Sequence, residues 1–463
     1  MSIGKKLFGP VDMTTGSPIE KLVVFAIPML LGNIAQQLYN TVDSIVVGQY
    51  VGDDALAAVG SAGPILNLLI VLFVGISMGS GIMASQYLGA RDREALSVTI
   101  GNCMVITGIA SVFIMIVASL IARPLLILLN TPSGILDWCT SYLLILFLGC
   151  AGMSYYNILS GVLRGLGDSV SALLYLLVAT GTNIVLDLLF VVVFHWGVNG
   201  VALATAIAQG VSAILCILKL SRMKEYFDFN LRYLRLDKKG AMDIVRLGIP
   251  TGITQAIISL AMITVQSLTN SFGEMFIAAN VIVQRVDGFA MLPNFSFGMA
   301  LTTYAGQNVG ARRFDRVEQG AKQGTLLALG TSGFITALIL IFGKDLMGIF
   351  TNTPELVDLS MRMMRILALG YLAMAVSQSL SGIMRGAGDT ITPMWITIIT
   401  TIVLRVPLAY IMTYLTRSPE HSHGLEECLF LSLLIAWIIG VIITYIFYKK
   451  GKWRKLALDA LNQ

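Results

Sequence analysis

The sequence predicts an all-α integral membrane protein, with twelve transmembrane helices in two six-helix lobes related by a parallel internal repeat. Three observations indicate this fold class. First, 56% of the 463 residues are hydrophobic and only 12% are charged, which is about half the charged fraction of a soluble domain. Second, apolar segments long enough to span a bilayer recur along the chain. Third, the two halves of the sequence repeat each other.

The repeat is clearest in two short motifs. Residues 160–169 (SGVLRGLGDS) return as residues 381–390 (SGIMRGAGDT), and Gln86, which precedes a Gly-Ala-Arg run, returns as Gln307 before the same run. Both pairs are separated by 221 positions. Internal repeats joined to apolar segments are typical of secondary transporters. We therefore expect the protein to move a compound across a membrane.

Each apolar segment predicts one spanning helix. The first helix is expected to begin at Pro18, with Ser17 as its N-cap and Glu20 completing a capping box. The twelve segments are 20–48, 54–80, 94–121, 137–160, 169–194, 197–220, 241–271, 276–305, 317–342, 356–382, 390–416 and 425–448.

A charged stretch divides these helices into two lobes. Residues 221–240 form the predicted linker between an N-terminal lobe, 1–220, and a C-terminal lobe, 241–463. Because each lobe has an even number of helices, the two lobes share one orientation in the membrane, which makes the repeat parallel rather than inverted.

Basic residues predict which side of the membrane the ends face. With the amino terminus in the cytoplasm, 5 of the 31 Lys and Arg residues fall on the outer side, and Arg285 and Arg405 lie at membrane depth. The remaining 24 fall on the inner side, where Lys and Arg are normally concentrated. We expect a multi-pass protein of the cell inner (cytoplasmic) membrane with both termini cytoplasmic.

A polar stripe runs along the first predicted helix. It consists of Asn33, Gln36, Gln37, Asn40 and Asp43. Because an unpaired polar group facing lipid costs several kcal/mol, the stripe must face the bundle interior or water. The amides either line a substrate cavity or hold neighbouring helices together by hydrogen bonds, whereas we interpret Asp43 as functional.

Helix geometry groups Asp43 with residues of two other helices. From the helical rise, Asp43, Asp187 and Thr205 lie at similar depth in the outer half of the membrane. Asn183 precedes Asp187 by one turn and lies on the same face. Two carboxylates that face each other away from water repel when both are charged, so such a pair is able to hold and release a proton.

Several motifs resemble the multidrug and toxic compound extrusion (MATE) family of bacterial transporters. They are the run from Asp12 through Ile27-Pro28 and residues 36–40 (QQLYN) to Gly48, and the paired Arg-Gly-x-Gly-Asp and Gln…Gly-Ala-Arg turns. The resemblance covers essentially the whole chain. It implies an antiporter that exports organic, cationic and amphiphilic compounds in exchange for H⁺ or Na⁺ by alternating access, and that uses no cofactor.

The resemblance also implies a location for the coupling ion. The amino-terminal lobe has features of the DinF-like branch of the family, in which carboxylates of this lobe carry the ion; the matching residues are Asp43, Asn183, Asp187 and Thr205. The seventh predicted helix has no acid and departs from the NorM-like pattern, with Gln255 and Gln266 as its polar residues and further cavity candidates. We therefore expect one principal coupling site, in the first lobe.

Other polar and proline residues are interpreted as structural or gating residues. The repeated glycine turns are not a nucleotide site, because no strand precedes them and the third glycine of that motif is missing. For Asp287 and Arg405, a structural ion pair is favoured over a role in substrate binding or gating. Pro28 is a candidate hinge. The predicted structural or gating residues are Pro28, Arg164, Asp168, Asp287, Arg385, Asp389 and Arg405.

Three other function classes remain as alternatives. A lipid-linked saccharide flippase would be expected to have a basic cavity for pyrophosphate, whereas the first lobe has acids. A passive channel or facilitator would need no titrating pair. A membrane-embedded enzyme is disfavoured because no HExxH or Ser/His/Asp set lies at one depth, so we expect neither catalysis nor a metal.

The expected partners follow from the same interpretation. They are a small-molecule substrate and the lipid bilayer. No ATPase subunit is implied, since the sequence has no Walker motif, and no basic and aromatic pattern indicates nucleic-acid binding. We expect the protein to act as a monomer.

Overall fold

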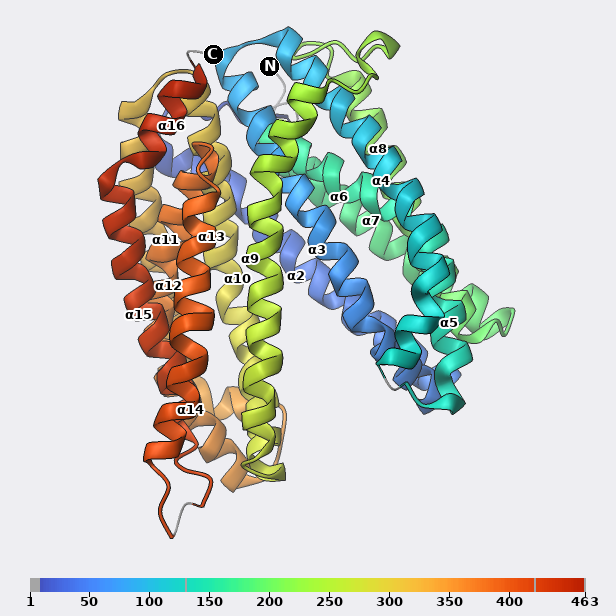
Figure 1. Ribbon diagram of the computed structural model, residues 1–463, viewed down its shortest axis with the longest axis vertical. Helices are drawn as coiled ribbons and strands as arrows, with labels where there is room; N and C mark the ends of the chain where they lie inside the picture. Colours follow the sequence, from blue (N-terminus) through green and yellow to red (C-terminus); the bar gives the residue numbers. More distant parts are fainter. Residues whose placement is uncertain (1–8, 130, 420–421, 462–463) are drawn as a thin grey trace. The chain divides into compact units, whose positions relative to one another are not determined.

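The computed structural model describes residues 9–129, 131–419 and 422–461, without the side chains of residues 53, 68, 460 and 461. Within these residues every regular element is helical (Figure 1). Eleven of the described helices are long and apolar enough to span a membrane, and a bent pair of shorter helices brings the number to twelve. The predicted fold class is confirmed. Lys5 and Lys6, which contribute to the predicted orientation, lie outside the described residues.

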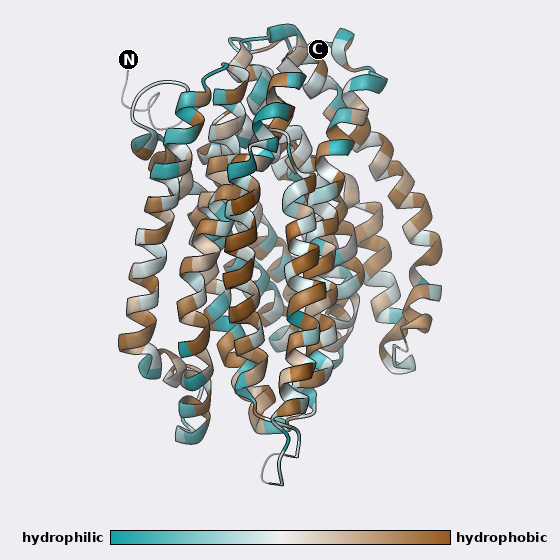
Figure 2. Ribbon diagram, turned by 60° about the vertical axis from the view of Figure 1, so that its left-hand side comes forward, coloured by the Kyte–Doolittle hydropathy of each residue, from teal (hydrophilic) through white to brown (hydrophobic). Residues whose placement is uncertain are grey.

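The first half of the chain contains the elements of the first repeat. Their bounds are α2 (Pro18–Val46), η1 (Val47–Val51), α3 (Asp53–Ala90), α4 (Arg93–Leu128), α5 (Ser133–Leu148), α6 (Cys150–Gly165), α7 (Ser169–Asp187), η2 (Leu188–Val193) and α8 (Gly197–Arg222). As predicted, the first helix begins at Pro18. Figure 2 shows apolar residues along the middle of the helices and polar residues gathered near their ends.

One predicted helix of this half is broken. The segment 137–160 was expected to form a single helix, but α5 and α6 meet at Gly149 with a bend of 53°. A Cβ atom on Gly149 would lie 2.5 Å from the Cβ of Ala206. The bend therefore coincides with a close approach to α8, which only a glycine permits.

The second half begins with a short 3₁₀ turn in the linker and ends with a helix beyond the last predicted span. The bounds are η3 (Leu231–Tyr233), α9 (Lys238–Asn270), α10 (Glu274–Gly310), α11 (Phe314–Gly348), α12 (Pro354–Gly386), α13 (Ile391–Thr397), η4 (Ile398–Arg405), α14 (Val406–Leu415), α15 (Glu427–Lys450) and α16 (Lys452–Leu461). The π-helical segment η4 joins α13 and α14 within one span.

The chain forms two compact units whose bounds differ from the lobes expected at 1–220 and 241–463. The first unit contains residues up to Asp12 and Ile27–Gly252, and the second contains Met13–Ala26 and Ile253–Gln463. The first turns of α2 thus belong to the second unit, and the first half of α9 belongs to the first. Both changes of unit fall within a few residues of a proline inside the helix, Pro28 in α2 and Pro250 in α9.

Backbone conformation repeats with the same spacing as the sequence motifs. The turn after α3 has Arg91 at φ 56°, and the turn after α10 has Arg312 at φ 57°. Gly167 and Gly388, the second glycines of the two Arg-Gly-x-Gly-Asp turns, have φ 87° and 96°. Each pair is 221 positions apart, so the repeat extends from the sequence to the local structure of the turns.

Glycines also produce the same helix crossing in both units. In the first unit a Cβ on Gly165 of α6 would lie 3.0 Å from the Cα of Gly81 of α3. In the second unit a Cβ on Gly386 of α12 would lie 3.0 Å from the backbone N of Gly306 of α10. Small residues let helix backbones approach closely within a membrane, and here they bring together the equivalent helices of each repeat.

In the second unit, the segment before α2 is bound to the last turn of α10. The Met13 N–H donates to the Gln307 side chain at 2.9 Å, and the Asn308 side chain donates to the Met13 carbonyl at 3.0 Å. Arg454 of α16 forms an ion pair with Glu318 of α11 at 3.0 Å. The Arg316 side chain of α11 also donates to the Met13 carbonyl at 3.3 Å, so the segment before α2 and helix α16 both contact α11.

Candidate functional site

Two carboxylates lie together inside the first unit. Asp43 is on α2, and Asp187 is the last residue of α7, immediately before the π-helical segment η2. Asp187 has no exposed surface, and one carboxyl oxygen of Asp43 is also buried. The two side chains interact directly, so a single proton between them would form a hydrogen bond. The structure thus brings the two predicted acids together.

The other two predicted residues complete the same cluster. The side-chain amide of Asn183 donates to the hydroxyl of Thr205 at 3.3 Å, which joins α7 to α8. The Tyr39 hydroxyl of α2 donates to the same oxygen at 3.5 Å. Thr205 therefore links the helices that carry Asp43 and Asp187, and all four predicted coupling residues share one site.

The cluster is rich in buried oxygen atoms that lack donors. No described residue donates a hydrogen bond to Asp43 Oδ1, to either carboxyl oxygen of Asp187, to Asn183 Oδ1 or to Gln209 Oε1. A buried charge without a partner costs several kcal/mol, and a buried polar group without a hydrogen bond is also unfavourable. Binding of a proton or of a small cation that prefers oxygen ligands would remove this cost.

π-Helical segments follow both acids. Segment η1 begins four residues after Asp43, and η2 begins directly after Asp187. Such segments widen one helical turn and are frequent at functional sites. The backbone therefore departs from regular α-helix within one turn after each carboxylate.

Sequence reasoning missed three residues of this neighbourhood. Tyr39 is 7% exposed, and Gln209 of α8 is 8% exposed and lies beside the Tyr39 hydroxyl. Tyr142 of α5 is buried close to the same acids. Helical spacing could have indicated two of them, since Tyr39 precedes Asp43 by one turn and Gln209 follows Thr205 by one turn.

The predicted cavity amides are more accessible. Gln37 and Asn40 of α2 are exposed, and the Gln36 side chain donates to Asn40 at 3.3 Å within the same helix. Asn33 is partly buried. The hydrogen bond of Gln36 runs along α2, so it does not serve to join α2 to a neighbouring helix.

In the second unit, Gln255 of α9 is exposed, and Gln266 donates to Asn270 one turn later at 2.8 Å. This bond also stays within its own helix. Gln266 thus resembles Gln36, whose side chain also bonds to the residue one turn later in the same helix.

The predicted ion pair between Asp287 and Arg405 does not form, so this interpretation was wrong. No nitrogen of Arg405 lies within 4.0 Å of the Asp287 carboxylate, although the two groups attract each other at longer range. Instead, the buried Tyr371 hydroxyl of α12 donates to Asp287 Oδ1 at 2.9 Å. The phenol takes the position expected for the guanidinium because α12, not η4, is the main neighbour of α10.

The two repeated turns form the same hydrogen bond at the start of the next helix, but the negative charge of their aspartates is compensated differently. Asp168 caps α7 by accepting from the Ser171 N–H at 2.9 Å, and Asp389 accepts from the Thr392 N–H at 3.0 Å. Lys219 of α8 forms an ion pair with Asp168 at 3.1 Å. The position 221 residues after Lys219 is a glycine, and the second carboxyl oxygen of Asp389 has no hydrogen-bond partner among the described residues.

The arginines of these turns lie close to the helix ends. Arg164 donates to Ser160 one turn earlier at 3.3 Å. The Nε atom of Arg385 is buried and has no partner among the described residues. The bond from Arg164 to Ser160 stays within α6.

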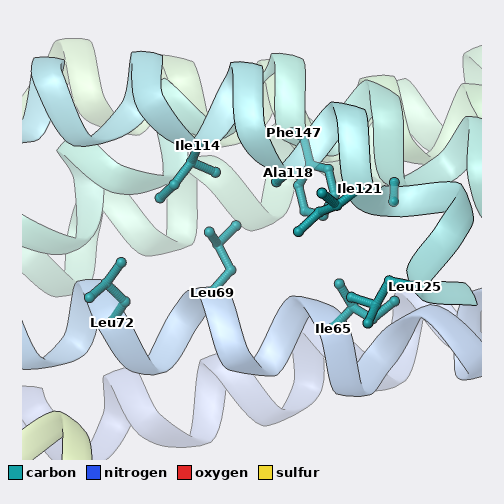
Figure 3. A pocket seen from close by; sticks show the side chains of 9 residues that line it. Ile65, Leu69, Leu72, Ile114, Ala118, Ile121, Leu125 and Phe147 are labelled. Carbon is teal, nitrogen blue, oxygen red and sulfur yellow. The ribbon is translucent and has the colours of Figure 1, made fainter. Parts of the chain in front are cut away.

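A separate apolar cavity of about 210 Å³ lies between α3, α4 and α5. Figure 3 shows Leu69 of α3, Ile114 of α4 and Phe147 of α5 among the side chains around it. All its lining residues are apolar, so they offer no group that would bind an ion or orient a charged compound. The carboxylate cluster remains the candidate functional site.

The family model described as MatE matches this chain twice, at residues 28–189 and 250–411. Together the two matches cover more than half of the sequence. The chain belongs to the MatE family. The two matched stretches contain most of the spans of the two repeats, which agrees with the duplicated turns and helix crossings. The family resemblance noted in the sequence is therefore confirmed, and the protein is a MATE-family transporter.

Relatives of similar length support this assignment. The chain is 29% identical to "Probable multidrug resistance protein YoeA" of Bacillus subtilis (strain 168), with 96% of each chain covered. It is 26% identical to "Probable multidrug resistance protein NorM" of Thermotoga maritima, over 95% of this chain and 94% of that protein.

Solved structures with this fold include two conformations. A MATE crystal structure in the straight conformation has a TM-score of 0.86 and 25% identity, covering 98% of this chain and 99% of the other. One in the bent conformation has a TM-score of 0.89 and 24% identity, covering 99% and 100%; the latter likeness concerns the fold alone.

Proposed function

We propose that this MATE-family transporter is a cation-coupled antiporter that exports organic, cationic amphiphilic compounds, with H⁺ or Na⁺ bound by Asp43, Asn183, Asp187 and Thr205. The observation that carries the proposal is the set of buried, donor-free oxygens of this cluster. A site of this kind is stabilised by binding one cation. The relatives named as multidrug resistance proteins support export of organic compounds.

Coupling requires that the ion and the substrate favour different states of the carrier. An ion shifts such an equilibrium only by its differential affinity for the two states. If a cation neutralises the acids, the first unit loses negative charge, and affinity for a positively charged substrate falls. Ion entry would then release the substrate, which gives exchange rather than leakage.

Pro28 is the proposed hinge of this cycle. The change from the second to the first unit within α2 occurs between Ala26 and Ile27, beside this proline. A proline inside a helix removes a backbone hydrogen bond and favours a kink at that place. Bending at Pro28 would change the position of Asp43 while the first turns of α2 stay in the second unit.

For orientation, we propose that residues 221–240 and both termini face the cytoplasm in the inner membrane. The distribution of Lys and Arg supports this assignment. Single cysteines placed at the exposed positions Lys224 and Arg417 of a cysteine-free variant should react with a membrane-impermeant maleimide from opposite sides. Labelling of both from outside intact cells would contradict the proposed orientation.

The function is tested with purified protein in proteoliposomes. Efflux of ethidium, a fluorescent organic cation, is measured under an imposed pH gradient and then under an imposed Na⁺ gradient. Asp43→Asn and Asp187→Asn keep the size of the side chain but remove its charge, so each variant should fold and yet lose gradient-driven efflux. Asp345→Asn removes an exposed acid of α11 and serves as the matched control.

A measurement without transport checks the ion site itself. A ligand that binds only the folded state raises its thermal stability with ligand concentration. Na⁺, or protonation at low pH, should therefore raise the apparent Tm of the wild type and of Asp345→Asn, but not of Asp43→Asn or Asp187→Asn. Wild-type efflux and wild-type thermal response in an acid variant would remove that carboxylate from the mechanism.

A further inference from the structure

The second unit contains a partly buried carboxylate that the proposed ion site does not use. Asp287 lies on α10, and its Oδ1 accepts the hydrogen bond from Tyr371 of α12 at 2.9 Å. Tyr371 has no exposed surface, and its ring packs 6.2 Å from the ring of Trp437 of α15. The phenol therefore holds the carboxylate in one orientation, and this bond uses Oδ1 and leaves Oδ2 to accept from another group.

A positive charge lies near this carboxylate without touching it. Arg405 is the last residue of the π-helical segment η4, which packs against α15. Its guanidinium attracts Asp287 but makes no contact within 4.0 Å. The Nε atom of Arg405 is buried and has no hydrogen-bond partner among the described residues. Both charged groups therefore have unused hydrogen-bonding capacity.

This arrangement is specific to the second repeat. The positions 221 residues before Asp287 and Arg405 are Leu66 and Ile184. Two opposite charges removed from water normally form a direct pair, because separation leaves each one incompletely compensated. Here Asp287 can still accept a hydrogen bond from an ammonium group, and Arg405 can still donate one to an anionic group.

We propose that Asp287 and Arg405 form a binding site for zwitterionic organic compounds, with the ammonium group of the ligand at Asp287 Oδ2 and its anionic group at Arg405. A compound with only a positive charge would be attracted by Asp287 but repelled by Arg405. A compound with only a negative charge would be attracted by Arg405 but repelled by Asp287. A zwitterion satisfies both residues at once with charge-assisted hydrogen bonds. The inference rests on the proposed export function, since it names a class of substrate, but the site lies entirely within the second unit.

Three dansyl compounds with similar chain lengths provide the test. They are Nε-dansyl-lysine, a zwitterion, dansyl-cadaverine, a cation, and dansyl-aminohexanoate, an anion. Each is titrated into purified protein in nanodiscs, without any ion gradient, and binding is followed by dansyl fluorescence. The wild type should bind the zwitterion about tenfold more tightly than either singly charged compound, which corresponds to about 1.4 kcal/mol.

Variants identify the residues. Arg405→Gln should weaken zwitterion binding about tenfold and leave the cation unchanged or more tightly bound. Asp287→Asn should weaken the zwitterion and the cation, and Tyr371→Phe should weaken the zwitterion because the carboxylate loses its fixed orientation. Arg405→Lys keeps the positive charge, so it should retain part of the zwitterion affinity that Arg405→Gln loses. Arg285→Gln removes a different guanidinium, which lies on α10 at an exposed position, and is the matched control.

Two results would overturn the inference. One is equal affinity for the three compounds in the wild type. The other is an equal loss for all three compounds in Arg405→Gln, with monodispersity and apparent Tm unchanged. Because binding is measured without a gradient, failure of ion-coupled ethidium efflux leaves this test intact, and failure here leaves the ion site of the first unit intact.

Discussion

The close crossings of glycine-bearing helices make a quantitative prediction in both units. An alanine Cβ at position 165 would lie 3.0 Å from two backbone carbons of Gly81, and nearer still to its carbonyl oxygen. Optimal carbon–carbon separations are about 3.5–4.0 Å. The new Cβ would clash with backbone atoms of α3 and not with the end of a flexible side chain. Helices α3 and α6 would therefore have to move apart.

The cost follows from two opposing effects. Overpacking of this kind costs about 1–3 kcal/mol, and the upper end applies because backbone is displaced. Alanine is better than glycine in a helix by about 1 kcal/mol. Gly165→Ala should therefore be destabilised by a net amount of about 2 kcal/mol, or an apparent Tm lower by about 4–8 °C for a unit of this size.

Controls separate packing from helix propensity. At Gly181 of α7 and Gly330 of α11, an added Cβ would have no heavy atom within 4 Å, so Gly181→Ala and Gly330→Ala should be neutral or stabilised by up to about 1 kcal/mol. Gly386→Ala, the equivalent of Gly165→Ala in the second repeat, should lose stability like its counterpart. The assay is thermal unfolding of detergent-solubilised protein, followed by the monodisperse fraction on size exclusion. Equal stability of Gly165→Ala and Gly181→Ala would refute the reasoning.

Two further predictions concern ion pairs at the ends of the spans. Lys219→Met should lower the free energy of unfolding by about 2 kcal/mol, because Asp168, whose side chain has no exposed surface, loses its cation. Adding Asp168→Asn should recover most of this loss. An unchanged Tm for Lys219→Met would contradict the prediction. The Arg93 guanidinium, which hydrogen-bonds to Asp228 at 2.6 Å, lowers the pKa of that carboxyl below its usual value of 3.8. A lowered folded-state pKa gives stability that is present above the unfolded value and is lost as pH falls through the folded value. The Tm difference between wild type and Arg93→Gln should therefore be positive at neutral pH and shrink as pH falls below about 4; a difference independent of pH would exclude the ion pair as its cause.

Sequence alone determined the spans, the repeat and the grouping of the two acids. Hydropathy and length identify a membrane helix because lipid satisfies no backbone hydrogen bonds, so a spanning segment must pair its backbone groups internally and be apolar. Depth along a helix is set by a constant rise per residue. That is why Asp43 and Asp187, 144 positions apart in the chain, could be assigned to one site before their contacts were known.

Only the tertiary structure decided which groups touch. It placed the Tyr371 hydroxyl, and not Arg405, against Asp287, put Tyr39 and Gln209 beside the acids, and divided α2 and α9 between two compact units. These outcomes depend on how far helix backbones approach and on where a π-helical segment rotates a side chain. Both are set by packing between residues far apart in the chain, whereas the pattern of a single sequence reports mainly on burial and on neighbours within one helix.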